Sequence, residues 1–577
     1  MKDLTFNSTF GFQTNSDRIG AYSSALTVGA AGKGNAAMSA NKNSSFIAED
    51  YVNYSTTFSE KHRLNVMAGY SYSYEKRESW GAFSNSFITD AFSFWNMGGG
   101  TETPSVATSG IIDEKLSSFY GRLNYGFGDK YLVTFTARYD GSSKFSKNEK
   151  WAFFPSGSLA WNMHNEDFMK QLSFISQFKW RASYGIVGNQ AINSYQTLAR
   201  VSPVLSIVNG IQVNAVQPSS VANDNLRWES TASTNIGFDI GFIQNRINLS
   251  ADFYKNITSD ELFQVNLPPY SGFASQIQNI GKVENKGMEF TISSKNLTGA
   301  FQWSTDFNIS FNRNQILELP SGKDIMYSNA PGHWPGFANP RIMREGQPLG
   351  SFYGYTYDGV YQTGDTFIPG AGFEQVAGGE KYRDINGRDT NGQLTGTGDN
   401  VLNADDQQII GNPNPDFTFG LSNEFSYKNF DLTVFLSGSQ GNDIYSYQLQ
   451  ELDNLGSYGY NATVAALDRW TPDHTNTNVP MKNINRSLKP SSRWVMDGSY
   501  IRLKNIMFGY TVPNTLLKKL AIQKVRVYVS AQNLLTFTKY KGFDPEVSYK
   551  ASNATLGTDY ASYPMVKSIT AGLSIVF

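Results

Sequence analysis

An oxygen-rich stretch holds the residues of this chain whose types and spacing best suit a metal ion. It runs over residues 384–391, with Asp384, Asn386, Asp389 and Asn391 spaced along it, and a second acidic stretch follows at 403–406. Carboxylate and amide oxygens at alternating positions are the ligands that Ca²⁺ prefers. However, Arg388 stands where a third Asp or Asn ligand is needed, and no Glu lies at position 12. A calcium loop and a solvated external loop whose Asp, Asn and Gly make turns both remain open.

Catalytic motifs are not found in the sequence. The histidines are scattered, with neither an HExxH motif nor a pair at i, i+4, and no GxSxG occurs. The segment around Lys33 departs from a phosphate-binding loop, because no Ser or Thr follows the lysine. There is no cysteine, which removes disulfides, thiolate zinc sites and thiol nucleophiles. We therefore predict no enzyme and no cofactor, and assign no catalytic, cofactor-binding or metal residue. The four histidines are His62, His164, His333 and His474.

Aromatic residues in the polar connections are candidates for ligand contact. Such rings could stack on sugars or grip peptide side chains. The alternative is that they pack loops together or line an interface with a partner, and we leave the substrate-binding residues unassigned. The candidates are Trp80, Phe92, Phe94, Trp95, Trp334 and Tyr445.

The composition favours β structure. Aromatics make up 14% of the 577 residues, charged residues only 17%, and glycine is abundant at 52. Phe and Tyr favour strands, and Gly marks turns and bulges. We find no run of 18 apolar residues, so a transmembrane helix is not expected, whereas transmembrane strands remain possible. The net charge of −1 gives no support for nucleic-acid binding.

Period-two alternation in segments of about ten residues is the dominant pattern. Residues 119–127 alternate between a Phe, Leu and Tyr face and a face that carries Arg122, and residues 131–140 repeat this after a turn at 128–130. A polar second face carrying Arg suits a water-filled lumen better than a packed sandwich core. The same alternation recurs at 178–184, 525–531 and 568–577.

The connections between these segments come in two sizes. Some are tight, as at 128–130 and 427–430, while others are long and rich in Gly, Asn, Asp and Ser, at about 80–115, 185–225, 320–410 and 440–495. Short turns at one end and long extracellular loops at the other are typical of an outer-membrane barrel. On this pattern alone, a soluble all-β chain remains the alternative.

Motifs in the C-terminal third resemble a known family. The stretch DGSYIRLKN at 497–505 resembles a signature of the SusC/RagA family of TonB-linked outer-membrane transporters. Earlier segments are similar to further family elements, so the resemblance runs from about residue 110 to the end. The segments that follow the family's order are NLRWE (225–229) with NIGFD (235–239), NIG (279–281) with NKGME (285–289), GSFYGY (350–355), IGNP (410–413), RWTP (469–472), FGYTVP (508–513), VRVYVSAQNLLTFT (525–538) and KYKGFDPE (539–546).

The resemblance implies a fold and a function. It implies an all-β chain, a transmembrane antiparallel β-barrel of the TonB-dependent receptor type over residues 1–577, with about 16–18 of roughly 22 strands present and long extracellular loops. It also implies import of oligosaccharides or peptides across a Gram-negative, Bacteroidetes-like outer membrane, with a SusD-like surface lipoprotein as lid and the TonB system as energy source. A passive pore or adhesin on the same barrel is the alternative.

The start of the sequence lacks a basic segment followed by an apolar core, so it is not a signal peptide. In the family, a plug and a TonB box precede the barrel, and neither is visible here. We therefore expect the chain to be the C-terminal part of a longer precursor.

Individual motif residues lead to further expectations. Alternation places Arg502 and Lys504 on one face of a strand, and we expect this face to line the lumen, with packing or assembly as the alternative. Gly498 and Gly542 suit turns with positive φ. Phe577, an aromatic that ends an alternating strand, resembles the assembly signal of outer-membrane barrels.

Overall fold

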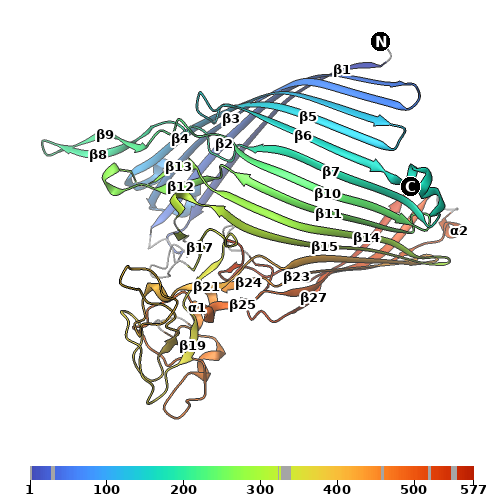
Figure 1. Ribbon diagram of the computed structural model, residues 1–577. Coiled ribbons are helices and arrows are strands. Elements are labelled where there is room, and N and C mark those ends of the chain that lie inside the picture. Colours follow the sequence, from blue (N-terminus) through green and yellow to red (C-terminus); the bar gives the residue numbers. More distant parts are fainter. Residues whose placement is uncertain are drawn as a thin grey trace. The chain divides into compact units, whose positions relative to one another are not determined.

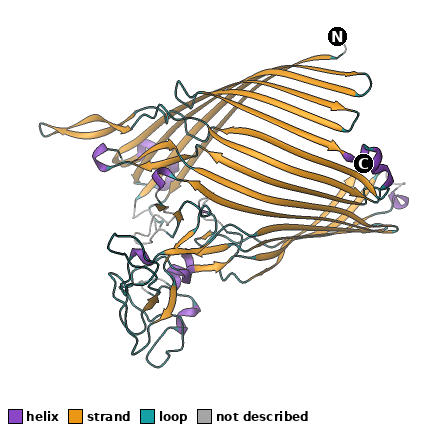
Figure 2. Cartoon of the chain, viewed as in Figure 1, coloured by secondary structure: helices purple, strands orange, loops and turns teal. Residues whose placement is uncertain are grey.

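The computed structural model describes residues 3–27, 33–273, 275–322, 324–326, 340–455, 461–517, 522–547 and 555–577. It consists mostly of antiparallel β-strands (Figures 1 and 2). Sixteen strands take part in the main sheet, within the predicted range. Within the described ranges, no helix is long and apolar enough to cross a membrane.

The main-sheet strands are β1 (Leu4–Ser23), β2 (Gly34–Phe58), β3 (His62–Phe87), β4 (Gly100–Phe127), β5 (Tyr131–Ser142), β6 (Trp151–Asn162), β7 (Ile175–Asn189), β10 (Glu229–Phe242), β11 (Ile247–Ser259), β14 (Lys282–Thr298), β15 (Phe301–Glu318), β22 (Phe417–Tyr427), β23 (Phe430–Gln440), β26 (Tyr500–Thr511), β27 (Lys524–Thr538) and β29 (Ser568–Val576). Short strands are β8 (Arg200–Val208), β9 (Ile211–Ser220), β12 (Leu262–Asn266), β13 (Ser275–Asn279), β16 (Ile325–Met326), β17 (Ile342–Met343), β18 (Phe352–Gly354), β19 (Tyr357–Val360), β20 (Glu380–Tyr382), β21 (Gln408–Gly411), β24 (Asp443–Ser446), β25 (Val495–Asp497) and β28 (Thr558–Asp559). The α-helices are α1 (Tyr447–Asp453) and α2 (Asn514–Leu517).

The chain divides into two compact units. The first comprises Met1–Asn165, Arg181–Thr234 and Thr258–Gly281, and the second comprises Glu166–Trp180, Asn235–Ile257 and Lys282–Phe577. In the first unit, β1 to β6 pair antiparallel in chain order. In the second, β14, β15, β22, β23, β26, β27 and β29 do the same.

The tight turns lie where the sequence predicts them. Between β4 and β5, Gly128 and Asp129 both have positive φ, at 57° and 56°. Between β22 and β23, Lys428 has a φ of 53°. The first turn has three residues, 128–130, and the second has two, 428–429, and positive φ lets the chain reverse direction within these short hairpin connections.

The expected strand length of about ten residues fits β5 and β6, with 12 residues each, but is wrong for the longest strands of the first unit. Strands β2, β3 and β4 contain 25, 26 and 28 residues. At about 3.3 Å per residue β4 extends about 90 Å, far beyond an apolar band of about 25 Å. The stretch 80–115, predicted as a loop, is therefore strand except for residues 88–99. Polar contacts between strands stabilise the extension, for example between β2 and β3, where Asn43 Nδ2 donates to Glu75 Oε1 at 3.1 Å.

A glycine of the NKGME motif has a packing reason. A Cβ at Gly287 on β14 would lie 2.1 Å from the carbonyl oxygen of Phe311 on the paired strand β15, and 2.7 Å from Tyr254 Oη. Because a strand carbonyl cannot move without breaking the ladder, we expect Gly287→Ala to cost about 1–3 kcal/mol. The readout is urea unfolding of the full-length protein in lipid. Gly299, with nothing within 4 Å, is the matched control, and Gly299→Ala should have little effect. Equal effects of the two substitutions would contradict the steric explanation.

Candidate functional site

The sheet of the first unit has an apolar face that remains exposed. Phe119, Leu123 and Phe135 share this face and are 52%, 40% and 53% exposed. Near the tight-turn end, Phe127 and Tyr131 stack with ring centroids 6.5 Å apart. A continuous band of exposed apolar side chains with aromatics at its border is what a lipid-facing surface requires.

The opposite face of the same strands is polar. Four side chains on β2, β3, β4 and β5 form a hydrogen-bonded ladder across it. Asn65 Nδ2 donates to Asn53 Oδ1 at 2.7 Å, Asn124 Nδ2 to Asn65 Oδ1 at 3.1 Å, and Thr134 Oγ1 to Asn124 Oδ1 at 2.9 Å. Neutral polar groups that satisfy one another, with Arg122 on the same face, make a wettable wall that suits an aqueous conduit.

In the second unit, an ion pair crosses the sheet over a motif glycine. Arg526 Nη2 on β27 lies 2.5 Å from Asp431 Oδ2 on β23, and β26 runs between these strands. A Cβ at Gly509 on β26 would lie 2.6 Å from both partners. The glycine of the FGYTVP motif therefore leaves room for this pair.

Three connections of the second unit fold into one body, which we call the loop assembly: residues 319–416, 441–499 and 539–567, excluding those outside the described ranges. Its core contains Phe352, Tyr445, Tyr447 and Trp494. Strands β24 and β28 pair in parallel, and the buried Arg341 Nη1 donates to the carbonyl of Gly350 at 2.6 Å while Nη2 donates to Thr558 Oγ1 at 2.5 Å. The long connections are thus interlocked rather than separate loops.

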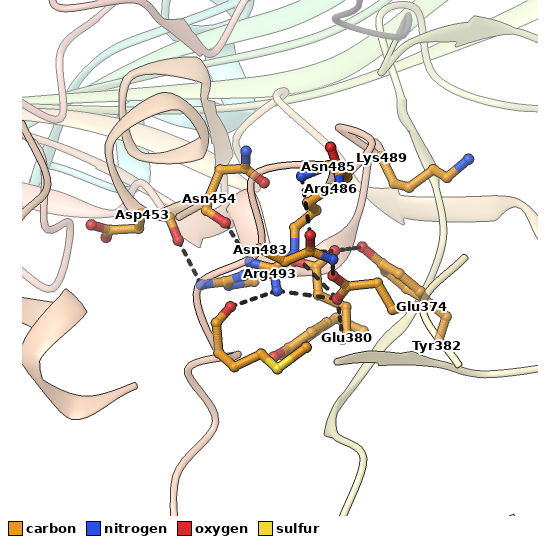
Figure 3. Close-up of polar contacts among 12 residues, drawn as sticks. Glu374, Glu380, Tyr382, Asp453, Asn454, Asn483, Asn485, Arg486, Lys489 and Arg493 are labelled. Carbon is orange, nitrogen blue, oxygen red and sulfur yellow. Dashed lines mark hydrogen bonds and ion pairs between the residues drawn. The ribbon is translucent and has the colours of Figure 1, made fainter. Parts of the chain in front are cut away.

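A buried charge cluster lies within the loop assembly (Figure 3). The Arg486 side chain is 1% exposed, and its Nη2 lies 3.1 Å from Glu374 Oε2 and donates to the carbonyl of Met481 at 2.7 Å. Its Nη1 donates to the carbonyl of Asn454. One guanidinium thus joins three segments of the chain.

A second arginine completes the cluster. Arg493 Nη1 lies 2.8 Å from Glu380 Oε1, and its Nη2 donates to the carbonyl of Asp453 at 3.0 Å (Figure 3). The backbone N–H of Glu380 donates to Glu374 Oε2 at 2.7 Å. Two arginines therefore face two glutamates, and together we call these four residues the buried charge cluster.

Neighbouring groups respond to this burial. Tyr382 Oη donates to Glu380 Oε2 at 2.7 Å, and burial, reinforced by the Glu380 charge, raises the pKa of Tyr382 well above its usual value. The Lys489 ammonium lies 4.5 Å from the ring centroid of Phe373, and burial lowers the pKa of Lys489. The tyrosine stays a neutral donor at physiological pH, so its hydrogen bond adds to the stability of the cluster.

The predicted lumen-lining cation Arg502 is instead buried. Its side chain is 2% exposed, its Nη2 lies 2.6 Å from Asp544 Oδ1 and its Nη1 lies 2.8 Å from Glu546 Oε2. Lys504 Nζ lies 2.8 Å from the same Glu546 oxygen. Ion pairs thus join the DGSYIRLKN and KYKGFDPE motifs. We call Arg502, Lys504, Asp544 and Glu546 the C-terminal clasp.

The expectation of positive φ at two motif glycines is wrong. Neither Gly498 nor Gly542 lies among the positive-φ residues. Instead, a Cβ at Gly498 would lie 2.6 Å from Asn442 Nδ2, and one at Gly542 would lie 2.3 Å from the Tyr540 ring. Close approach of neighbouring groups, and not a left-handed turn, requires glycine here.

In the oxygen-rich loop, backbone donors occupy the carboxylates. Asp384 accepts from the N–H of Asn400 at 2.6 Å, and Asp389 accepts from the N–H groups of Asn391 and Gln393 at 2.9 and 2.8 Å. Arg388 Nη2 lies 2.5 Å from Asp405 Oδ1. Among the described residues, no group of three or more His, Cys, Asp or Glu side chains is placed to hold a metal ion.

This geometry predicts a calcium-independent loop. We expect Asp384→Ala to lower the local stability of the loop by about 1–3 kcal/mol, because its backbone donors lose their acceptor. The loss should be equal with Ca²⁺ and with chelator, measured by hydrogen exchange of the Asn400 amide in the full-length protein. Asp389→Ala provides a second position. The prediction is contradicted if Ca²⁺ increases the protection of the Asn400 amide in the wild type and either substitution abolishes this increase.

The described candidate aromatics belong to different units and differ in exposure. Trp80, Phe92 and Trp95 lie in the first unit and are 48%, 50% and 67% exposed, whereas Tyr445 is fully buried in the loop assembly, so its candidacy as a ligand contact is wrong. Phe94 covers Gly20, where a Cβ would lie 2.4 Å from its ring. His333 and Trp334 lie outside the described residues.

An exposed apolar face backed by a hydrogen-bonded polar face defines the wall of an outer-membrane β-barrel. The family model "TonB dependent receptor-like, beta-barrel" matches residues 2–534. The chain belongs to this family, which confirms the predicted fold class and the outer-membrane location.

Individual relatives agree. TonB-dependent receptor P3 of Formosa agariphila is 44% identical over 100% of this chain and 56% of its own length. TonB-dependent receptor SusC of Bacteroides thetaiotaomicron is 33% identical over 80% of this chain and 44% of its own length. A solved structure described as the RagAB peptide transporter superposes with a TM-score of 0.85 and 26% identity, covering 100% of this chain and 60% of that one. The chain thus spans about half the length of these curated relatives, and the SusC/RagA resemblance is confirmed.

Sequence reasoning missed the buried charge cluster. Glu374 and Glu380 precede Arg486 and Arg493 by more than a hundred residues, in connections where charged residues are ordinarily solvated. No local spacing marks such partners. Figure 3 shows the four side chains close together although they come from distant parts of the chain.

Proposed function

We propose that the chain forms the outer-membrane pore wall of a TonB-dependent nutrient importer, SusC-like, that takes up oligosaccharides or peptides with a SusD-like lipoprotein as lid. The observation that carries this proposal is the two-faced sheet, apolar on one side and polar on the other, in a chain 44% identical along its whole length to a TonB-dependent receptor. Residues 1–577 would act as one barrel part. Coupling to TonB would lie in the portion of the full-length relatives with which this chain does not align.

The interlocked loop assembly supports an importer over a passive pore. A simple pore needs only short or separate loops, whereas a buried charge cluster and two apolar cores make a rigid body at the mouth. Such a body can present a fixed surface to a lid and to a ligand. The similar proteins are TonB-dependent receptors and a peptide transporter, which favours transport over catalysis.

Uptake by cells that express the full-length protein tests the proposal. Fluorescent oligosaccharide and peptide mixtures should enter wild-type cells, and the uptake of one class should stop when TonB is deleted. Uptake that continues without TonB would support a passive pore and overturn the importer. A chain that stays soluble without detergent, and whose gel migration does not change on heating, would overturn the barrel itself.

A further inference from the structure

The long connection that follows β7 contains a regular hairpin that the proposed function leaves unused. Strands β8 and β9 pair along their whole length, and the turn between them is Asn209 and Gly210, with φ of 51° and 77°. Asn-Gly with two positive φ angles is the turn that best matches strand twist. Figure 1 shows this ribbon, which we call the arm, reaching away from the other strands of the first unit.

One face of the arm is uncovered and carries apolar side chains on β8, with Gln212 and Asn214 beside Val216 on β9, whereas Val204 and Val213 on the opposite face are partly covered. Val201, Leu205 and Ile207 alternate along β8 and are 65%, 64% and 75% exposed, and Val216 on the same face of β9 is 71% exposed. No charged residue occurs from Val201 to Asn223. Monomeric proteins rarely leave such a face open, so a contact surface is indicated.

The edges of the arm are protected against strand addition. Each strand carries a proline, Pro203 on β8 and Pro218 on β9. A proline fits a paired strand where its missing N–H would face outward, and there it cannot donate to an added strand. The contact surface is therefore the apolar face and not an edge.

The base of the arm is fixed. Asn223 N–H donates to the carbonyl of Thr197 at 3.1 Å, and its Nδ2 donates to the carbonyl of Ile277 at 2.7 Å. Leu226, three residues on, is fully buried in a core with Trp228. A fixed base presents the face in one orientation, which lowers the entropy lost on binding.

The composition and size of the arm exclude other occupants. A lipid-inserting loop needs aromatic or basic anchors, and a sugar platform needs aromatic rings, yet residues 201–223 contain neither. Arg200, the cation of the arm, lies at its base, where its Nε donates to Ser220 Oγ at 3.1 Å. A face about 30 Å long and about 10 Å wide buries about 600 Å² in total against its own copy, half of the roughly 1,200 Å² that a stable interface requires. The arm therefore suits a protein partner that also contacts the transporter elsewhere.

We propose that the apolar face of the arm docks on the surface lipoprotein of the importer, against an uncharged apolar patch of that lipoprotein. This rests on the proposed function, which supplies the lipoprotein. The position of the arm supports it, because β7 starts at the tight-turn end and the arm follows its far end, where the long connections lie.

A binding measurement tests the arm. The full-length transporter, purified in detergent, is titrated with the purified SusD-like lipoprotein of the source organism. The double substitution Leu205→Glu with Ile207→Glu should weaken the dissociation constant at least tenfold. Ser206→Glu, on the same strand and the opposite face, is the matched control and should change it less than twofold.

Photo-crosslinking distinguishes the loss of a contact from the misfolding of the substituted protein. A crosslinking amino acid at Leu205 should capture the lipoprotein, and one at Ser206 should not. If the double substitution leaves the dissociation constant of the wild type unchanged, the proposed docking of the arm is wrong, while the proposed function is unaffected. If the double substitution abolishes only the association of the transporter with itself, the face binds a second copy of the chain, and docking on the lipoprotein is wrong as well. If the wild-type transporter does not bind the lipoprotein, both the docking of the arm and the lipoprotein lid of the proposed function are wrong.

Discussion

Arg486→Ala should open the loop assembly, at a cost of about 3–5 kcal/mol. Removing this guanidinium leaves Glu374 without its ion pair, and it leaves the carbonyls of Met481 and Asn454 without a donor. A buried charge that loses its partner is costly, because neither water nor another cation replaces the arginine. The measurement is hydrogen exchange of the Glu380 amide, which donates to Glu374 in the intact cluster.

An exposed ion pair in the same assembly is the control. Arg383 Nη2 lies 2.7 Å from Asp358 Oδ1, with the side chains 58% and 40% exposed. Arg383→Ala should cost less than about 1 kcal/mol, since water solvates the charges that remain. If the Glu380 amide exchanges equally fast in both variants, the buried charge cluster does not hold the assembly together.

A compensated variant separates charge from packing. Arg486→Met with Glu374→Gln removes the unpaired carboxylate while keeping most of the buried volume. It should recover a large part of the stability that Arg486→Ala loses, because apolar or neutral replacements of buried ion pairs are often close to neutral. If the double variant recovers no stability, the loss in Arg486→Ala comes from the contacts with the carbonyls of Met481 and Asn454 instead.

The transmembrane part of the sheet could be predicted because its signal is local. The alternation at 119–127 and 131–140 recurs as β4 and β5, and the turn at 128–130 joins them. The lengths of β2 to β4 were underestimated because the apolar alternation is interrupted beyond the apolar band, for example by the four consecutive charged residues at 75–78. There, cross-strand contacts such as Asn43 Nδ2 with Glu75 Oε1 stabilise the pairing, and no apolar period marks them.

The sites depend on contacts that are distant in sequence. Glu374 meets Arg486 and Arg502 meets Asp544 across long separations, so composition shows the charges without showing their partners. The family resemblance placed Arg502 in a motif but gave no reason for it. The β8–β9 hairpin was missed, because residues 185–225 were predicted only as a long connection, although Asn209-Gly210 is a local hairpin signal.

The C-terminal clasp should fail in acid, and Asp544 should be the reason. Burial alone would raise the pKa of Asp544, but the N–H groups of Glu546 and Met565 and the Arg502 guanidinium outweigh it and lower the pKa. A carboxyl with a lowered folded-state pKa stabilises the fold above its unfolded pKa of about 3.9, and this stability is lost as pH falls through the folded value. Protection of the Glu546 amide in the full-length protein should therefore persist from pH 7 to about pH 4 and fall below it.

Two substitutions identify the clasp as the titrating element. Asp544→Asn should cost about 1.5–3 kcal/mol at pH 7 and flatten the dependence below pH 4, because the neutral amide has no proton to gain. Arg502→Ala should cost more, about 3–5 kcal/mol, since it leaves Asp544 unpaired in a site where that side chain is 6% exposed. The control is Asp416→Asn, which removes an exposed partner of Arg313 in the same unit. It should leave the loss of Glu546 amide protection below about pH 4, which we call the acid limb, unchanged. An acid limb that survives Asp544→Asn would move the titration to another carboxyl of the clasp, Glu546 being the remaining one that contacts Arg502.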